Sequence, residues 1–428
     1  MNIETLYQYF LNSNGVTTDS RKVTDNQIYF ALKGENFDGN LFAQAALNQG
    51  ALLAVVDNKD VITDENKNNY FLVDDVLSAL QKLANYHRKQ LNIPIISLTG
   101  SNGKTTTKEL IHIVLKQKFN TVATVGNLNN HIGVPLTLLS MNKHTEFGIV
   151  EMGANHQKEI ELLCRIAEPD YGYITNFGKA HLEGFGGVEG VIKGKSEMYD
   201  YLYSHEKMAF INADDPIQVE KTKKIKHFSF GKNNTDVDII IDSIDANPNV
   251  KIILNNITIN TSLIGIYNAT NTCAAITIGK YFNITDEQIK TAIESYLPTN
   301  NRSQIIERDT NKIILDAYNA NPSSMDVAIA NLDQLNVDNK IAILGDMFEL
   351  GDASNNEHKN IIEKAIEANI EKIYFVGERF YENQILNQKV EYFKNLESLK
   401  ARFDFSDYTN STILIKGSRG MALERLLQ

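Results

Sequence analysis

The chain has 428 residues, of which 43% are hydrophobic and 22% are charged, and its formal net charge is −11. This composition is typical of globular proteins, the length favours two or three domains, and the negative charge argues against a nucleic-acid partner. No apolar run reaches the roughly 18 residues that a membrane span needs, and the N-terminus lacks the basic and apolar regions of a signal peptide. We therefore expect a cytoplasmic protein without membrane insertion, in which Cys164 and Cys273 are reduced and buried. The sequence does not fix the oligomeric state, and a monomer is the default expectation.

Residues 1–92 are expected to form a small α/β domain. Strand-like runs occupy residues 27–32 and 51–56, and apolar residues recur at helix spacing over 76–86. The segment 92–94 has the composition of a linker into the next block.

Strands and helices alternate from residue 93 to 298, which predicts a central domain with a parallel sheet. Its strand-like runs lie at 95–99, 147–152 and 171–175. Residues 299–428 alternate again and predict a Rossmann-like, doubly wound sheet. The strand-like runs of this block lie at 312–316, 340–344, 372–376 and 412–415. The predicted fold class is therefore α/β with three domains.

The segment 95–107 has the layout of a phosphate-binding loop. An apolar run ends in Gly100, Ser101, Asn102, Gly103, Lys104, Thr105 and Thr106, and a helix-like segment follows. The glycines let backbone N–H groups approach the phosphates of ATP, and the helix dipole favours their charge. Lys104 is expected to reach the terminal phosphates, and the Thr105 hydroxyl to bind Mg²⁺. Two residues separate Gly100 from Gly103, whereas four separate the glycines of the usual loop. A tight turn without a ligand is the alternative.

Two further polar groups follow neighbouring predicted strands. Glu151 lies near the end of the run 147–152, and His181 follows the run 171–175. Ligands of parallel sheets bind at the carboxyl ends of the strands, and Mg²⁺ prefers hard oxygen ligands. We therefore expect Glu151 and His181 to join Thr105 in a magnesium site, although each residue alone could be an ordinary surface or packing residue.

Motifs in a fixed order connect the phosphate loop to both ends of the chain. They lie at residues 18–21, 31–34, 126–135, 151–156, 181–185, 193–197, 212–215, 316–322, 344–351 and 416–419. Together they resemble the Mur ligase family of bacterial cell-wall synthesis, and most strongly its members that add D-alanyl-D-alanine. The resemblance implies an ATP-dependent ligase that joins D-alanyl-D-alanine to a UDP-muramyl-tripeptide through an acyl phosphate.

The same resemblance places Lys195 at a lysine that CO₂ carbamylates in most of these ligases. A carbamate would turn the cation into an anion and offer oxygen atoms to the second of two expected Mg²⁺ ions. The reaction needs the neutral amine, which nearby cations and partial burial favour. An unmodified lysine that pairs with a phosphate or with Glu197 is the alternative, and Lys193 lies two residues away.

The resemblance also implies residues that bind the nucleotide. Asn268 and Asn271 correspond to asparagines that contact adenine, although Tyr267 stands where the family has histidine. Arg302 corresponds to an arginine that meets the γ-phosphate, and Asp316 to a residue that binds ribose. The expected catalytic set is Lys104, Lys195, His181 and Arg302.

Contacts to the other substrates are implied as well. Ser20, Arg21, Lys33, Gly34 and Asp38 resemble a pocket for uridine diphosphate, with a surface turn at Asp19 as the alternative. Asn129 and Asn130 are expected at the sugar–diphosphate, and Asn319 and Asn321 at the dipeptide. Asp346, Lys416 and Arg419 belong to matching motifs but could equally be solvated loop charges.

Two other functions are compatible with parts of this pattern. A ligase that adds the third stem residue, lysine or diaminopimelate, shares the first-domain pocket, but its Asp-Asn-Pro-Arg motif is missing here. A non-enzymatic nucleotide-binding scaffold is the second alternative, and the complete catalytic set argues against it. Folylpolyglutamate synthetases, which are related, lack this kind of first domain.

Overall fold

The computed structural model describes residues 2–62, 67–234, 236–298 and 301–428. Thr299, where the third domain was predicted to begin, lies outside these ranges. The chain forms two compact units. The first contains residues up to 98, 119–153 and 159–172, and the second contains residues 99–118, 154–158 and 173–428.

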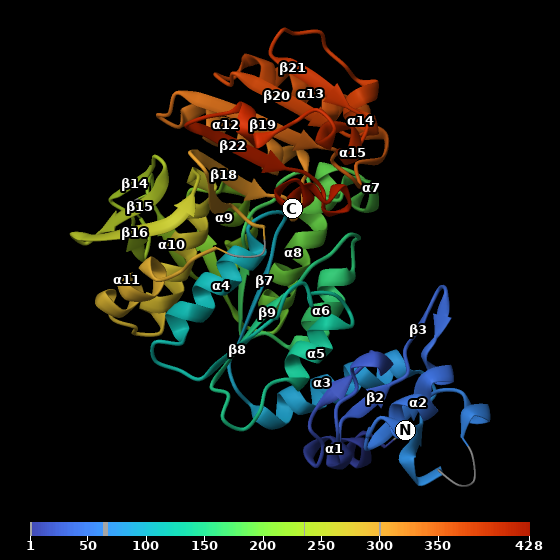
Figure 1. Ribbon diagram of the computed structural model, residues 1–428. Helices are drawn as coiled ribbons and strands as arrows, with labels where there is room; N and C mark the ends of the chain where they lie inside the picture. Colours follow the sequence, from blue (N-terminus) through green and yellow to red (C-terminus); the bar gives the residue numbers. More distant parts are fainter. Residues whose placement is uncertain (1, 63–66, 235, 299–300) are drawn as a thin grey trace. The chain divides into compact units, whose positions relative to one another are not determined.

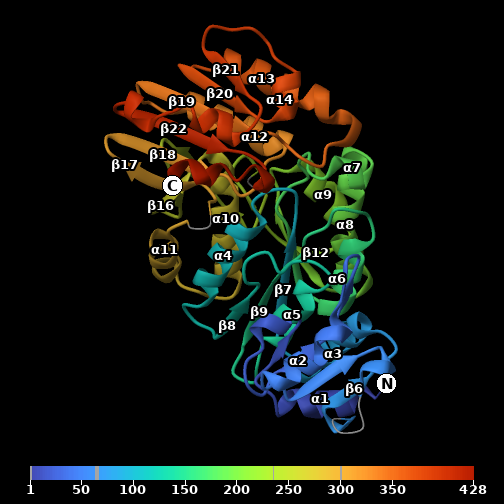
Figure 2. The ribbon, with the colours of Figure 1, turned by 45° about the vertical axis from the view of Figure 1, so that its right-hand side comes forward.

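The N-terminal residues form a four-stranded parallel sheet with the strand order β1-β2-β5-β6, coloured blue in Figure 2. Its strands are β1 Val16–Thr17, β2 Ile28–Phe30, β5 Leu53–Val56 and β6 Tyr70–Leu72, and a hairpin joins β3 Lys33–Gly34 to β4 Phe37–Asp38. The helices are α1 Ile3–Leu11, α2 Ala43–Asn48 and α3 Val76–Leu91. Ala43 and Ala46 of α2 pack with Tyr29 and Ala54 of the sheet in one core cluster.

Helix α3 is longer than the predicted 76–86. The Asp75 carboxylate accepts the Ser78 N–H at 2.7 Å and caps the N-terminus, and the helix ends before Asn92, which has a φ of 49°. His87 and Arg88 are polar but buried, because His87 Nε2–H donates to the Met141 carbonyl at 2.9 Å and the Arg88 guanidinium donates to the Asp170 carboxylate at 2.7 Å. Because these residues are polar, the spacing of apolar residues did not predict the last turn of α3.

The central residues form a seven-stranded sheet with the strand order β13-β12-β11-β10-β7-β9-β8 (Figure 1). The strands are β7 Ile95–Thr99, β8 Thr121–Ala123, β9 Phe147–Glu151, β10 Tyr171–Ile174, β11 Met208–Asn212, β12 Lys226–Gly231 and β13 Ile239–Ile240. The helices are α4 Lys104–Leu115, α5 Gly133–Leu139, α6 Glu159–Ala167, α7 Leu182–Phe185, α8 Val188–Ser204 and α9 Pro216–Thr222. Every residue of β7 and β9 is buried, as expected for parallel strands covered on both faces.

An antiparallel sheet that the sequence analysis did not predict follows the central sheet. It contains β14 Ser243–Ala246, β15 Asn249–Leu254 and β16 Ile257–Ile264, and helices α10 Ile266–Tyr281 and α11 Asp286–Glu294 come next. Asn255 and Asn256 connect β15 to β16 with φ values of 48° and 64°. An asparagine pair between strands of alternating burial is a hairpin signal that could have revealed this sheet.

The C-terminal sheet has the order β17-β18-β22-β19-β20-β21 and is orange to red in Figure 1. The strands are β17 Gln304–Arg308, β18 Asn311–Asp316, β19 Asn339–Gly345, β20 Lys372–Val376, β21 Val390–Phe393 and β22 Ser411–Lys416. The helices are α12 Pro322–Gln334, α13 Ser354–Glu367, α14 Glu378–Glu382 and α15 Leu396–Lys400. Only the edge strand β17 is antiparallel to its neighbour, so the predicted Rossmann-like sheet is confirmed.

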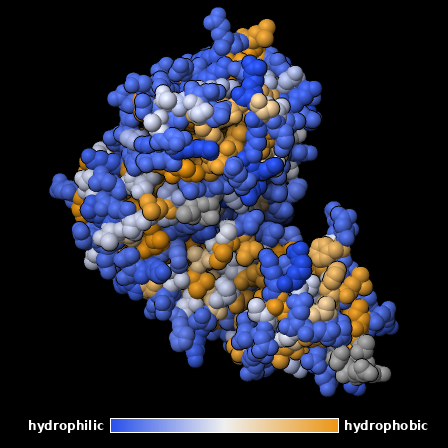
Figure 3. Space-filling view, viewed as in Figure 1, coloured by the Kyte–Doolittle hydropathy of each residue, from blue (hydrophilic) through white to orange (hydrophobic). Residues whose placement is uncertain are grey.

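The molecular surface mixes hydrophilic and hydrophobic residues on the face shown in Figure 3. Among the helices of the described residues, none is long and apolar enough to cross a membrane. Cys164 and Cys273 are buried and unbridged, as predicted.

Candidate functional site

The predicted phosphate loop connects β7 to α4 and has the expected strand–turn–helix layout. Gly100 and Gly103 have φ values of +143° and +79°, which L side chains rarely adopt. A Cβ atom on Gly103 would lie 2.5 Å from the Asn271 side-chain oxygen. Since α4 begins at Lys104, the first N–H groups of this helix, including those of Thr105 and Thr106, are oriented toward the loop and could bind an anion.

Residues after β10 fix the shape of this loop. The Thr175 hydroxyl and the Asn176 amide donate to the Asn102 carbonyl oxygen at 2.6 and 3.0 Å. The Ser101 hydroxyl donates to the Gly178 carbonyl at 2.6 Å. Hydrogen bonds to residues at the end of the neighbouring strand β10 therefore hold the loop in place without a ligand.

The predicted nucleotide residues gather around the same loop. The Lys104 ammonium folds back and donates to the Gly100 carbonyl at 2.6 Å. The Asn271 amide, which packs against Gly103, donates to the Asn268 side-chain oxygen at 3.0 Å. Both asparagines are buried on α10, so the structure brings the expected adenine residues to the phosphate loop.

Glu151 ends β9 and is only 1% exposed. In the sheet register it lies opposite Leu98, directly before the phosphate-loop segment of the chain. The Asn129 amide donates to the Glu151 carboxylate at 2.8 Å, whereas the Asn130 side chain accepts the Gly133 N–H at 2.9 Å. Of the two predicted asparagines, Asn129 thus contacts the acidic residue, and Asn130 accepts backbone N–H groups at the start of α5.

Lys195 and His181 occupy different surroundings. Lys195 lies on α8, is 1% exposed, and donates to the Ala154 carbonyl at 3.0 Å, with its ammonium 4.9 Å from the Phe185 ring centroid. His181 pairs through Nδ1 with Glu349, and this hydrogen bond lowers the pKa of the Glu349 carboxyl. Within the described residues, no group of three or more histidine, cysteine, aspartate and glutamate side chains is placed to hold a metal ion.

Arg302 and Asp316 lie in a compact polar cluster of the second unit. The Arg302 guanidinium stacks on Tyr318, with its Cζ atom 3.6 Å from the ring centroid. The Asp316 carboxylate accepts from the Lys416 ammonium at 2.6 Å and from the Ser303 N–H at 3.2 Å. Lys416 is 2% exposed, so it is an ion-paired interior residue and not a solvated loop charge.

Residues predicted to bind the dipeptide line a small cavity of about 210 Å³. Its walls contain Ala180, His181, Asn319, Ala320, Asn321, Phe348, Glu349, Ser418, Arg419 and Gly420. Asn321 caps α12 and donates to the Asn102 side-chain oxygen of the phosphate loop at 2.7 Å. The cavity therefore adjoins the phosphate loop through an amide contact.

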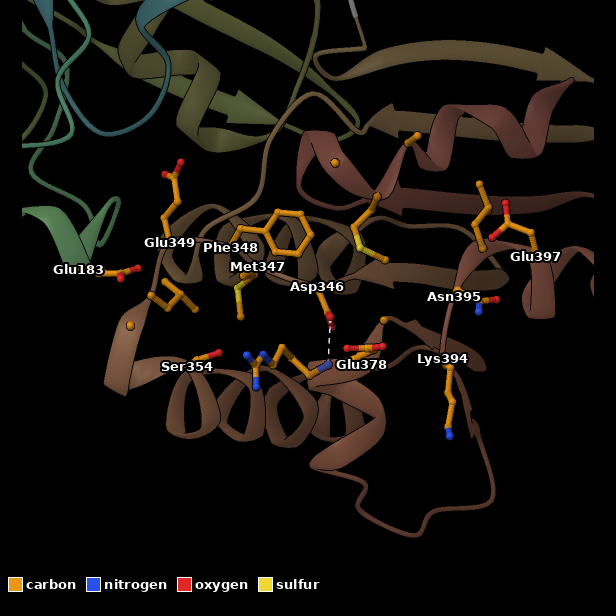
Figure 4. Close-up of a pocket in the computed structure, with 18 of the residues that line it drawn as sticks. Glu183, Asp346, Met347, Phe348, Glu349, Ser354, Glu378, Lys394, Asn395 and Glu397 are labelled. Atoms are coloured by element: carbon orange, nitrogen blue, oxygen red, sulfur yellow. Dashed lines mark hydrogen bonds between the residues drawn. The ribbon is translucent and has the colours of Figure 1, made fainter. Parts of the chain in front are cut away.

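A larger cavity of about 680 Å³, drawn in Figure 4, shares Phe348, Glu349 and Gly420 with the first one. The Asp346 carboxylate at its base accepts the N–H groups of Arg379 and Phe380 at 2.9 and 3.0 Å. Asp346 is 3% exposed, so this residue is not a solvated loop charge either, and burial raises its pKa. Arg419, in contrast, is 60% exposed.

In the first unit, Asp19 and Arg21 pair with each other. The Asp19 carboxylate accepts from Arg21 Nε at 2.9 Å and caps the short turn Ser20–Lys22, so the surface turn considered above is present. Burial, together with Asp19 and Asp38, raises the pKa of Tyr29 to about 12. Tyr29 lies opposite Thr17 in the sheet register, and its hydroxyl donates to the Gly39 carbonyl at 3.0 Å, so Tyr29 lies between the segments that contain Ser20 and Asp38.

The hairpin β3–β4 holds the remaining first-domain residues. Lys33 and Asp38 are cross-strand partners, and Gly34 pairs with Phe37 in the same hairpin. The Lys33 ammonium also pairs with Asp57 at 2.8 Å. Sequence reasoning missed Tyr29, Asp57 and Glu349, whose roles depend on contacts between distant segments and not on a local pattern.

Three family models match the chain. The model described as "Mur ligase family, catalytic domain" matches residues 12–88, "Mur ligase middle domain" matches 98–279, and "Mur ligase, glutamate ligase domain" matches 301–419.

Similar proteins cover nearly the whole chain. The UDP-N-acetylmuramoyl-tripeptide–D-alanyl-D-alanine ligase of Bacillus subtilis is 34% identical, over 97% of this chain and 92% of that protein. The ligase of the same name from Escherichia coli is 32% identical, over 97% and 93%. A crystal structure of MurF from Acinetobacter baumannii superposes with a TM-score of 0.87 at 29% identity, over 99% of this chain and 97% of that one. MurF ligase from Thermotoga maritima, solved in complex with ADP, gives 0.84 at 27% identity, over 98% and 97%.

Proposed function

Since the chain belongs to the Mur ligase family, we propose that it joins D-alanyl-D-alanine to a UDP-N-acetylmuramoyl-tripeptide with conversion of ATP to ADP and phosphate. The observation that carries this proposal is the near-complete match to ligases of that name, which extends over both the phosphate loop and the cavity lined by Asn319 and Asn321. The activity belongs to peptidoglycan precursor synthesis, which takes place in the cytoplasm.

The phosphate loop is suited to hold ATP. Backbone N–H groups at the start of α4 and the Lys104 ammonium would contact the phosphates, and Asn268 and Asn271 would contact adenine. Gly100, Ser101, Asn102 and Gly103 would shape the cradle, with Thr105 and Thr106 in the first helical turn. Arg302 would meet the γ-phosphate, and Asp316 would contact the ribose.

The donor set is compatible with Mg²⁺. The Thr105 hydroxyl and the buried Glu151 carboxylate are hard oxygen ligands, which Mg²⁺ combines with substrate phosphates. His181 would contribute its Nε2 atom, and a carbamylated Lys195 would supply oxygens to a second ion. The reaction with CO₂ requires the uncharged amine of Lys195, which is 1% exposed. Bound Mg²⁺ would neutralise the charge that develops on the phosphates.

The proposed reaction has two steps, phosphorylation of the tripeptide carboxylate and attack by the dipeptide amine. A carboxylate oxygen of the tripeptide attacks the γ-phosphorus, the bond to the β-phosphate oxygen breaks, and ADP leaves. The amine of D-alanyl-D-alanine attacks the carbonyl carbon of the resulting acyl phosphate. The tetrahedral intermediate expels phosphate, the amine proton is lost, and the amide remains. The chain's main contributions are positioning and electrostatic stabilisation.

The other substrate contacts complete the proposal. Ser20, Arg21, Lys33, Gly34 and Asp38 would bind the uridine diphosphate, Asn129 and Asn130 the sugar–diphosphate, and Asn319 and Asn321 the dipeptide. We propose domain bounds of 1–92, 93–298 and 299–428 and a monomeric state.

Phosphate release measured with a matrix of substrates tests this function. Release is expected with the UDP-muramyl-tripeptide plus D-alanyl-D-alanine, and neither substrate alone should support it. Release with a UDP-muramyl-dipeptide plus lysine or diaminopimelate, and none with the tripeptide pair, would assign the chain to the ligase that adds the third residue.

A further inference from the structure

The Arg302 side chain rests on an aromatic ring. Its Cζ atom lies 3.6 Å from the centroid of Tyr318, close enough for a strong cation–π contact. Its Nε atom is buried and has no hydrogen-bond acceptor among the residues that the structure describes. The ring thus holds a guanidinium that still has a donor to offer, and a phosphate oxygen is the kind of acceptor that satisfies it.

A second tyrosine contacts the side chain of Ser303, the residue after Arg302. The hydroxyl groups of Tyr267 and Ser303 lie 2.6 Å apart, and the Ser303 N–H donates to Asp316 at 3.2 Å. Ser303 is 5% exposed, so this pair is shielded from water. Burial keeps the pKa of the Tyr267 hydroxyl well above its ordinary value, which leaves the hydroxyl protonated and able to donate.

Tyr267 is itself fixed in orientation. Its ring lies directly over Gly265, where a Cβ atom would be 2.5 Å from Tyr267 Cε1. Asn268, the next residue, is anchored by its amide to the Ile264 carbonyl at 2.8 Å. The hydroxyl that reaches Ser303 therefore projects from the same turn of α10 that carries the proposed adenine contacts.

We propose that Tyr318 and Tyr267 are positioning residues for Arg302. The Tyr318 ring holds the guanidinium, and the Tyr267 hydroxyl holds the side chain of the next residue, Ser303, so that the arginine meets the terminal phosphate of ATP already ordered. A long arginine side chain loses much rotational freedom when it is fixed, and ordering it before ATP binds leaves more of the contact energy for catalysis. The inference rests on the role of Arg302 in the proposed function.

The test uses steady-state kinetics of the full chain with varied MgATP. Tyr318→Leu removes the ring and should lower kcat/KM for ATP by roughly 3- to 30-fold, the range expected for a cation–π contact. Tyr318→Phe keeps the ring and should stay within about twofold of the wild type, and Tyr203→Leu, at an exposed tyrosine of α8, is the matched control. Tyr267→Phe and Ser303→Ala each remove one hydroxyl and should have equal, non-additive effects.

Double variants with Arg302→Ala distinguish positioning from a general structural role. If the tyrosines act through Arg302, then Tyr318→Leu and Tyr267→Phe should cause no further loss in the Arg302→Ala chain. Equal losses with and without Arg302, or unchanged kinetics of both tyrosine variants, would overturn the inference while leaving the proposed function intact. Full activity of Arg302→Ala would overturn the role of Arg302 in the proposed function and the inference with it.

Discussion

Lys104 is the single residue on which the proposed phosphate chemistry depends most directly. We predict that Lys104→Ala lowers kcat by roughly 10²-fold or more, because a cation at the developing phosphate charge is removed. Phosphate release gives the rate, and thermal unfolding shows whether the fold is kept. Lys116→Ala, at the exposed end of the same helix, is the control and should be fully active. A folded Lys104→Ala chain with normal kcat would contradict the phosphate-loop assignment.

Lys195 offers a test by chemical rescue. If its carbamate supplies oxygen ligands, Lys195→Ala should be nearly inactive, and a short carboxylic acid such as acetate should partly restore phosphate release. Methylamine should not do so, and acetate should not improve Lys193→Ala. Rescue of Lys195→Ala by methylamine alone would show instead that the lysine acts as a cation.

Sequence reasoning identified individual site residues where they belong to a local motif. The phosphate loop could be read directly because its glycines, lysine and threonine are consecutive. The partners of these residues could not be read in this way. Tyr318 lies 16 residues after Arg302, and Glu349 lies 168 residues after His181, so only the folded chain reveals these contacts.

At the scale of elements, α1 and α3 are joined by a buried histidine. The His87 Nε2–H donates to the Met141 carbonyl at 2.9 Å, and the Tyr7 hydroxyl, 3.2 Å from Nδ1, donates to that nitrogen. A proton on Nδ1 would displace this donor, and burial lowers the pKa of His87. The neutral form is therefore the one that the fold accepts.

This arrangement predicts a loss of stability at acidic pH. Because the folded-state pKa of His87 is lower than the unfolded value near 6.5, the unfolded chain binds a proton that the folded chain does not as the pH falls below about 6.5. The contribution of neutral His87 to the free energy of unfolding is complete above this pH. It is lost as the pH falls toward the folded-state pKa, at up to about 1.4 kcal/mol per pH unit. The free energy of unfolding, measured with urea at pH 7.5 and at pH 5.5, should differ less between the two pH values for His87→Gln than for the wild type. An equal difference would refute the assignment, and the exposed His144→Gln is the control.

The strands that were predicted from the sequence are those whose apolar runs match their burial, such as β5, β7, β9 and β20. β7 and β20 were predicted with their observed bounds, and the loop after β7 was also found. The antiparallel strands β14–β16 were missed because strand–helix alternation was assumed to continue through the central block. The end of α3 was missed because His87 and Arg88 are buried through hydrogen bonds and not through apolar character.

At the scale of the whole molecule, the proposed reaction requires one chain to bind ATP and both substrates. The small cavity is lined by the residues predicted to bind the dipeptide, and it adjoins the phosphate loop through the Asn321–Asn102 contact. We predict that Asn321→Ala raises KM for D-alanyl-D-alanine more than KM for ATP. Steady-state kinetics with each substrate varied in turn measures this difference, and an equal rise in both constants would indicate a general disturbance of the α12 cap.

The central claim is that this chain makes one particular amide bond. Mass spectrometry of a reaction with ATP, Mg²⁺, UDP-muramyl-tripeptide and D-alanyl-D-alanine tests it most directly. The account predicts a UDP-muramyl-pentapeptide, formed in a one-to-one ratio with released phosphate and absent when ATP is omitted. Phosphate release without pentapeptide, or a product formed only from a UDP-muramyl-dipeptide and a single amino acid, would contradict it.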